Sequence, residues 1–208
     1  MRAEVYFDVL CPWCYIGKRR LTAALRDAPG AGLLWRSREL DPEGSRVPGP
    51  TAAEVIAAYQ PDPAQAAARV ARIQALGAAE GLTLKLDKAR PVNSFDAHRL
   101  VHLGASCGLA DQVLERLMHG HHTEGLNIAD PDVLKALAAD AGLDPTRTAE
   151  LLTGDAGKAS EGGVRTTADP SGRGESAGEP LGGGDPSADA GQGRALTYIT
   201  VSGYGDVY

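Results

Sequence analysis

Two cysteines separated by two residues, placed where a strand pattern changes into a helix pattern, constrain the fold of this chain more than any other feature. The motif is Cys11-Pro12-Trp13-Cys14. Before it, apolar residues alternate over positions 5–10, which predicts a strand. Pro12 suits a first helical turn, because its missing N–H would have no intrahelical partner there. Strand, CxxC and helix in this order indicate redox chemistry rather than zinc binding, since the sequence has no second cysteine pair to complete a zinc site.

The position of the motif at a helix start predicts different roles for its two thiols. The partial positive charge of a helix N-terminus stabilises a thiolate. Cys11 is therefore expected to be the more exposed thiol and the nucleophile that attacks a disulfide, and Cys14 to resolve the mixed disulfide. Pro12 and Trp13 control which backbone N–H groups face the sulfur, so we expect them to lower the pKa of Cys11. Both are also candidates for substrate binding.

Charge and apolar patterning argue against several classes of partner. A net charge of -6 over 208 residues gives no electrostatic reason to expect nucleic acid or an anionic membrane surface. No apolar run is long enough to span a bilayer, and no secretory segment precedes the first strand, so a cytoplasmic protein is expected. Three cysteines do not make a structural disulfide framework. Cys107 is expected to be a small buried residue near a helix end.

The first 153 residues divide into two predicted parts. Residues 1–42 have the patterns of a strand, a helix and a strand. Residues 43–153 have a loop followed by a block of helices. The residues predicted to cap these helices are Thr51, Asp62, Ser94, Asp130 and Asp144. A strand–helix–strand unit followed by helices favours an α/β sheet domain that carries a helical insertion.

The composition changes after Gly154. Residues 154–194 are mostly Gly, Ser, Ala, Asp, Arg, Thr and Pro, and such a stretch buries too little surface to offset its ordering entropy, so we expect disorder. Residues 195–208 begin with a strand pattern, which predicts a C-terminal strand. The composition of this tail resembles translation of GC-rich DNA in a shifted reading frame, which is our hypothesis for its origin.

The octapeptide 11–18 resembles the active-site signature of the DsbA-like thioredoxin-fold proteins, in particular the FrnE-type branch related to the 2-hydroxychromene-2-carboxylate isomerases. The segments 93–100, 123–128 and 130–134 are similar to the same branch, in the same order and spacing. The resemblance implies a thioredoxin-like α/β fold with a large helical insertion. It also implies thiol–disulfide oxidoreductase or isomerase activity at Cys11 and Cys14, which in some members is tied to polyketide biosynthesis.

The resemblance stops near Gly154. Thioredoxin folds return after the insertion with a cis-proline loop, two strands and a closing helix. The prolines that follow here, Pro170, Pro180 and Pro186, stand among Gly, Ser, Asp and Glu, and none precedes a strand pattern. We therefore expect the C-terminal half of the sheet to be incomplete or disordered.

Polar residues of the segment 93–100 are the remaining candidates for substrate binding. In the glutathione-dependent isomerases of similar architecture this segment helps to line the substrate cleft, which implies such a role for Asn93 and Arg99. The structural alternative is a helix start in which Ser94 caps and Asp96 complements the helix dipole. Near the motif, Tyr15 is expected to pack and Lys18 to be a solvated helix charge.

The five histidines allow a metal site but do not favour one. His98 and His102 share a helix face, and the other three gather at the end of a helix, at positions 119, 121 and 122. No HExxH pattern is present. The resembling family often has aromatic residues near His121, which implies packing, so no metal is expected.

Three functions follow as hypotheses. The first is a dithiol oxidoreductase acting on protein or small-molecule disulfides, without a cofactor apart from a low-molecular-weight thiol as co-substrate. The second is a thiol-dependent isomerase of the 2-hydroxychromene-2-carboxylate type. Such isomerases generally have Ser as the nucleophile and lack the second thiol, so the presence of Cys11 and Cys14 favours the first. The third is a catalytically weak binding protein or defective product that lacks the cis-proline loop.

Overall fold

The computed structural model describes residues 2–26, 32–154 and 196–199. Most of the stretch expected to be disordered, 154–194, lies outside the described residues, and so do the prolines at 170, 180 and 186. Within the range 195–208, a short strand is described at 196–199. No helix among the described residues has the length and apolar character needed to cross a membrane.

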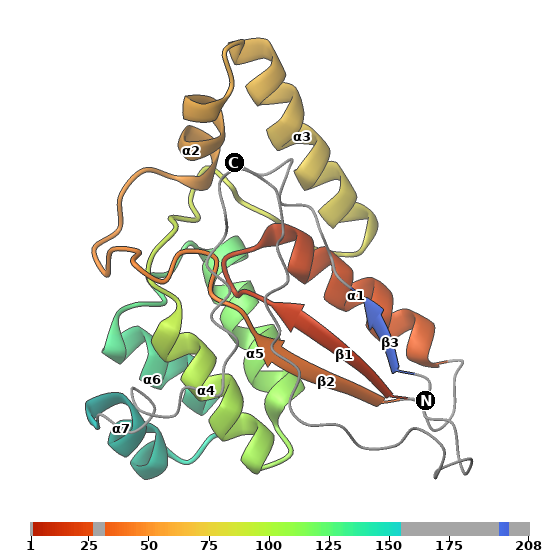
Figure 1. Ribbon diagram of the computed structural model, residues 1–208. Helices are drawn as coiled ribbons and strands as arrows, with labels where there is room; N and C mark the ends of the chain where they lie inside the picture. The colour runs from red at the N-terminus through yellow and green to blue at the C-terminus, as the bar shows by residue number, and fades with distance from the viewer. Residues whose placement is uncertain (1, 27–31, 155–195, 200–208) are drawn as a thin grey trace, which may run out of the picture.

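A small parallel sheet forms the base of the fold. Strand β1 (Arg2–Phe7) is followed by helix α1 (Pro12–Arg26) and strand β2 (Gly32–Ser37), so the predicted strand, helix and strand are all present. β1 and β2 pair in parallel from Arg2↔Gly32 to Phe7↔Ser37. Strand β3 (Leu196–Ile199) pairs in parallel with the other side of β1, which gives the order β2-β1-β3 (Figure 1).

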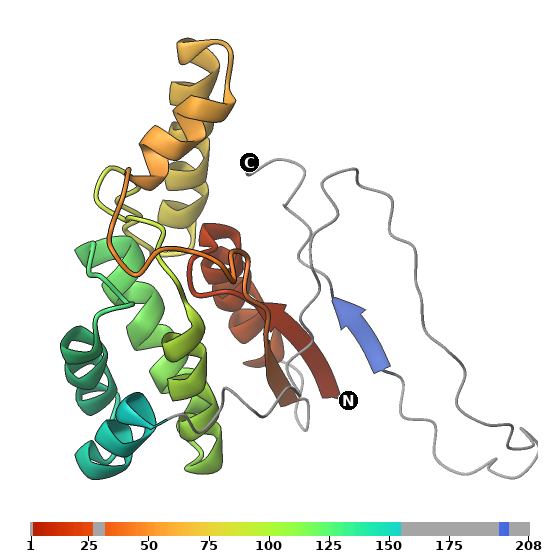
Figure 2. The ribbon, with the colours of Figure 1, turned by 60° about the vertical axis from the view of Figure 1, so that its left-hand side comes forward.

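Helices make up most of the remaining described chain. The elements are α2 (Ala52–Tyr59), α3 (Pro63–Ala79), α4 (Phe95–Ser106), α5 (Ala110–His119), the π-helical turn η1 (Gly120–Glu124), α6 (Pro131–Asp140) and α7 (Pro145–Thr153). In both ribbon views α2 and α3 stand at the top, whereas α4, α6 and α7 gather at the lower left (Figures 1 and 2). In Figure 1 the two long strands therefore lie below α2 and α3 and to the right of α4, α6 and α7.

Four of the five predicted caps are confirmed and one is wrong. Side-chain oxygens accept backbone hydrogen bonds at four helix starts: Thr51, Asp62, Asp130 and Asp144. Ser94 makes no such bond, because its backbone angles (φ -102°, ψ 3°) are not those of an extended capping residue. Asn93 takes its place, and its Oδ1 accepts from the backbone N–H of Phe95 at 3.1 Å.

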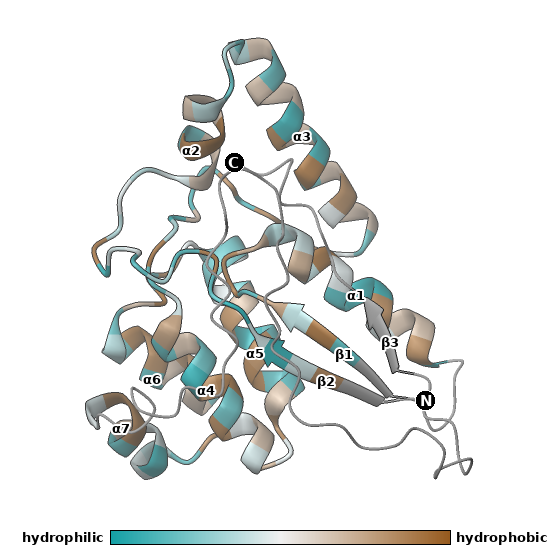
Figure 3. Ribbon diagram, viewed as in Figure 1, coloured by the Kyte–Doolittle hydropathy of each residue, from teal (hydrophilic) through white to brown (hydrophobic). Residues whose placement is uncertain are grey.

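One hydrophobic core joins the sheet to the helices. Helices α1, α3 and α5 carry hydrophobic and hydrophilic residues side by side, as amphipathic helices do (Figure 3). Their buried side chains form a continuous cluster with Phe7 and Val9 at the end of β1 and with Ile128 after η1. The CxxC motif therefore rests on a packed base that both predicted parts supply.

The packing at Ile128 predicts a measurable loss of stability. Its side chain is fully buried in the cluster, so Ile128→Val removes a methyl group that nothing replaces. We expect the free energy of unfolding in urea to fall by about 0.5–1.5 kcal/mol. Val47→Ala is the matched control, because Val47 is 74% exposed, and its change should stay within about 0.5 kcal/mol. Equal losses in both variants would contradict this description of the core.

Candidate active site

Cys11 and Cys14 lie at the junction of β1 and α1, and both are free thiols. The backbone N–H of Cys11 donates to the carbonyl of Asp8 at 3.2 Å, which closes a tight turn between strand and helix. The turn draws Cys11 inward, so that it is 6% exposed, whereas Cys14 is only partly buried. The expectation that Cys11 is the more exposed thiol was therefore wrong.

The two thiols differ sharply in acidity. A hydrogen bond from the Cys14 side chain is the main influence that lowers the pKa of Cys11, and it prevails over burial. The backbone N–H groups of Cys14 and Trp13 lower it further, which is the direction expected from the sequence. The same thiol–thiol bond, together with burial, raises the pKa of Cys14 well above its ordinary value. The negative charge therefore belongs on Cys11 and the proton on Cys14.

Helix α1 supports this division because its first turn contains no acidic residue. No carboxylate therefore competes for the partial positive charge of the helix N-terminus, which can stabilise the thiolate of Cys11. Pro12 is buried at the first helical position, and Trp13 is partly exposed and packs against the core. Both lie between the two cysteines in the chain, and their part in substrate binding stays a prediction.

Asp8 is a site residue that the sequence analysis missed. Its carboxylate is fully buried and accepts hydrogen bonds from the backbone N–H of Leu10 (3.2 Å) and Leu40 (2.6 Å). Nε2 of His98 lies 3.2 Å from its Oδ1. Burial acts to raise the pKa of Asp8, but the His98 contact and the two N–H groups hold it below the ordinary value. One acidic residue inside an apolar strand pattern, three positions before Cys11, was the available signal.

His121 and His122 fill the space behind the motif as neutral rings. Both are fully buried, and burial lowers the pKa of His121 to about 4 and that of His122 well below its ordinary value. Nε2 of His122 donates to the carbonyl of Val9 at 2.9 Å, and its ring stacks on Tyr15. The predicted packing role of these histidines is confirmed. Among the described residues, no three His, Cys, Asp or Glu side chains group in a way that could hold a metal ion.

Charged residues of α1 and α5 hold the two helices together beside the motif. Tyr15 packs as predicted, and its hydroxyl donates to Glu115 at 2.8 Å. Lys18 was expected to be solvated, but it is 4% exposed, because Nζ lies 2.9 Å from both Glu115 and Asp111. Arg19 contacts the same Glu115 carboxylate. Lys18 therefore fixes α1 against α5.

Asn93 and Arg99 lie on the segment that enters α4, and their described contacts are with the protein itself. The side-chain amide of Asn93 donates to the carbonyl of Pro42 at 3.1 Å. Arg99 is buried and donates to Asp96 at 2.9 Å. It also donates to two carbonyls at the C-terminal end of α7, those of Leu151 and Gly154. These bonds hold the loop after β2 and the end of α7 against α4. A role of either residue in substrate binding stays a prediction.

The third cysteine is remote from the motif. Cys107 is exposed at the end of α4, which corrects the expectation that it is buried. Its Sγ lies 3.1 Å from Nη1 of Arg147, which comes from α7. The thiol therefore contacts an exposed cationic side chain, whereas the sequence predicted burial.

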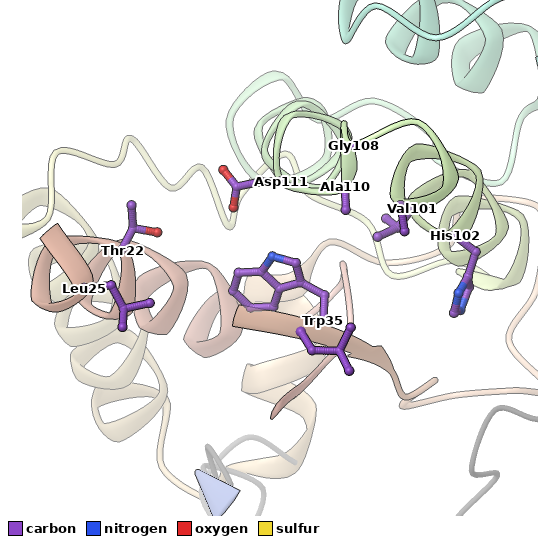
Figure 4. A pocket seen from close by; sticks show the side chains of 10 residues that line it. Thr22, Leu25, Trp35, Val101, His102, Gly108, Ala110 and Asp111 are labelled. Atoms are coloured by element: carbon purple, nitrogen blue, oxygen red, sulfur yellow. The ribbon is translucent and has the colours of Figure 1, made fainter. Parts of the chain in front are cut away.

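A separate pocket opens at the edge strand β2 (Figure 4). Its volume is about 480 Å³, and it lies between the second half of α1 and the helices α4 and α5. The lining residues are Thr22, Leu25, Leu34, Trp35, Val101, His102, Ala105, Gly108, Ala110 and Asp111. Thr22 lies on α1 about two helical turns after Cys14, and neither active-site thiol lines the pocket.

Comparisons with known proteins agree with this architecture. The family model of DsbA-like thioredoxin domains matches residues 2–166. A probable DsbA oxidoreductase from Streptomyces coelicolor is 33% identical, with a TM-score of 0.68 over 74% of this chain and 68% of that chain. A search of curated protein sequences finds no match.

Two further solved structures share the fold at lower identity. A 2-hydroxychromene-2-carboxylate isomerase is 18% identical, with a TM-score of 0.56 over 75% of this chain and 73% of that chain. The cytosolic disulfide reductase DsbM from Pseudomonas aeruginosa is 22% identical, with a TM-score of 0.54 over 76% and 72%. The predicted fold class, a thioredoxin-like α/β fold with a large helical insertion, is confirmed.

Proposed function

The chain belongs to the family of DsbA-like thioredoxin domains, and we propose that it is a thiol–disulfide oxidoreductase that works through Cys11 and Cys14. The observation that carries the proposal is that the pKa values of the two neighbouring thiols are shifted in opposite directions. The pKa of Cys11 is lowered mainly by the bond from Cys14, and the pKa of Cys14 is raised by the same bond and by burial. Cys11 is therefore the thiolate that can attack a disulfide, and Cys14 remains a protonated thiol until the resolving step.

The reaction follows from this arrangement. The Cys11 thiolate attacks one sulfur of a substrate disulfide, which forms a mixed disulfide and releases the other sulfur as a thiolate that takes up a proton. Cys14 then loses its proton and attacks Sγ of Cys11. The Cys11–Cys14 disulfide forms, the second substrate thiol leaves, and two electrons have passed from the dithiol to the substrate. A low-molecular-weight thiol or a reduced protein thiol returns the pair to the dithiol state, and a dithiol substrate runs the sequence in reverse.

The alternative of a thiol-dependent isomerase keeps some support from the fold shared with a 2-hydroxychromene-2-carboxylate isomerase. An isomerase of that type does not need a resolving thiol, however, and this chain provides Cys14 in hydrogen-bonding contact with Cys11. We therefore favour disulfide exchange on a protein or small-molecule disulfide. One structural neighbour is described as cytosolic, which supports the expectation of a cytoplasmic protein.

Equilibration of the full chain with glutathione buffers of increasing oxidised fraction tests the proposal. Mass spectrometry after quenching should show a two-electron conversion of the dithiol to the Cys11–Cys14 disulfide. A reduction potential of about -270 mV would indicate a reductant, and one of about -120 mV would indicate an oxidant. The Cys14→Ser variant should form only a mixed disulfide between Cys11 and glutathione. Failure to form the intramolecular disulfide at any buffer ratio would reject the proposal and leave the isomerase or a binding protein.

A further inference from the structure

The pocket beside β2 takes no part in the proposed disulfide exchange. Its volume of about 480 Å³ falls within the roughly 300–1,000 Å³ that is typical of small-molecule sites. Six of its ten lining residues have hydrophobic side chains, and a mainly apolar lining with a few polar groups is the composition that such sites share. Neither Cys11 nor Cys14 lines it, so a molecule bound here would not be the disulfide under attack.

Trp35 supplies an aromatic surface to this pocket. In Figure 4 its ring lies in the middle of the lining, with Thr22 and Asp111 on one side and His102 on the other. The ring is partly buried and meets the Phe7 ring of the neighbouring strand edge to face, with 5.8 Å between the centroids and an interplanar angle of 85°. This contact fixes the indole before any ligand arrives, and a fixed indole favours a flat aromatic partner that stacks on it.

The two ionisable residues among the described lining residues are also held in place. Oδ1 of Asp111 lies 2.9 Å from Nζ of Lys18, and Nε2 of His102 lies 3.0 Å from the hydroxyl of Ser37. Burial is the main influence that lowers the pKa of His102, so its ring is neutral near pH 7. A cation would have to compete with Lys18 for the Asp111 carboxylate, and an anion would be repelled by it. These groups therefore suit a ligand without net charge.

We propose that this pocket binds an uncharged, planar aromatic molecule with a hydrogen-bond donor, which stacks on Trp35 and donates to the carboxylate of Asp111. The Asp111 side chain is 54% exposed, and within the part of the chain that the structure describes only its Oδ1 is paired. Oδ2 is therefore left to accept from a ligand at the pocket mouth. The inference goes beyond disulfide exchange, because it gives the chain a second binding site, apart from the thiols.

NMR titration of the full chain, labelled with ¹⁵N, tests the inference with 2-naphthol, which is flat, uncharged at pH 7 and carries one hydroxyl donor. The two tryptophans give two indole N–H signals, which Trp13→Phe assigns. We expect the Trp35 signal to move with a dissociation constant of roughly 0.1–3 mM, and the Trp13 signal to stay in place. Naphthalene-2-sulfonate, an anion with the same rings, should bind roughly 5- to 10-fold more weakly. 2-Methoxynaphthalene, which lacks the donor, should bind roughly 3-fold more weakly.

Two leucine substitutions provide a matched pair. Ala105 is an exposed residue of α4 in the lining, so Ala105→Leu fills part of the pocket without removing a core contact. Ala75→Leu makes the same change at an exposed position of α3, outside the lining. We expect Ala105→Leu to weaken the binding of 2-naphthol roughly 10-fold and Ala75→Leu to leave it unchanged.

A Trp35 signal that does not move at about 3 mM 2-naphthol would overturn the inference, whether the pocket closes or another segment of the chain fills it. Equal binding by the two leucine variants would overturn it as well, and equal binding of the sulfonate would reject the proposed class of ligand. If Ala105→Leu does not fold, the wild-type titration decides, and a larger shift at Trp13 than at Trp35 would reject the site. None of these readouts involves disulfide exchange, so they remain decisive if the chain reduces no disulfide.

Discussion

Cys11→Ser is expected to reduce insulin disulfide reduction to the rate of the buffer thiol alone. The serine hydroxyl is not ionised near neutral pH and cannot exchange with a disulfide, so the first step of the sequence is lost. Cys14→Ser should instead retain the attack but not the resolution. We expect it to accumulate a mixed disulfide at Cys11 that mass spectrometry can identify. Turnover by insulin precipitation and the trapped species together assign the two roles.

Cys107→Ser is the matched control for these variants. Cys107 is exposed at the end of α4 and contacts Arg147, far along the chain from the motif. Its replacement should leave insulin reduction unchanged. Substantial activity in Cys11→Ser, or a mixed disulfide located on Cys14, would contradict the roles assigned here. An isomerase activity that survives in Cys11→Ser would favour a reaction without a redox cycle.

Acid is expected to destabilise the chain strongly through His121 and His122. Burial holds the pKa of His121 at about 4, against an ordinary value of 6.5, and that of His122 well below it. Below pH 6.5 these two histidines therefore bind protons in the unfolded chain but remain neutral in the folded chain. Stability is fully present above pH 6.5 and is lost as the pH falls toward 4. His121 alone should remove about 3 kcal/mol of unfolding free energy between pH 8 and pH 4, and His122 should add to this.

Asp8 adds to the loss only at lower pH. Its pKa is held below the ordinary value of 3.8 by His98 and two backbone N–H groups, although burial alone would raise it. Its contribution to stability is therefore present above about pH 3.8 and is lost as the pH falls through the lower folded value. Acid unfolding should show the histidine contribution first.

Urea unfolding of the wild-type chain and of His121→Gln at several pH values between 8 and 4 measures this effect. His121→Gln should flatten the dependence on pH, whatever its stability at pH 8. His119→Gln is the control, since His119 is partly exposed and belongs to the same turn of chain. Equal pH dependence in all three proteins would show that the buried histidines do not titrate as described.

The sequence specified the parts of this molecule that depend on local patterns. The strand before Cys11, the helix start at Pro12 and the caps at Asp130 and Asp144 all follow from residues within a few positions of each other. The lowered pKa of Cys11 could also be predicted in direction, because a helix N-terminus and neighbouring N–H groups act over one turn.

The features that the sequence did not reveal are contacts between distant segments. Lys18 looks solvated in its own helix, and only the approach of α5 brings Glu115 and Asp111 to its ammonium group. The bond between Asp8 and His98 joins residues 90 positions apart. Tertiary packing decided each of these.

Competition between Cys11 and Cys14 for an alkylating reagent tests the central claim most directly. Cys11 is the more buried thiol, so accessibility alone favours modification of Cys14, whereas the charge distribution favours Cys11. The reduced chain is treated with a small amount of iodoacetamide at pH 7, and the two sites are separated by fragmentation of the peptide that contains them. We expect the label on Cys11, with loss of insulin reduction in proportion to labelling. Labelling that begins on Cys14, or full turnover after Cys11 is blocked, would contradict the account.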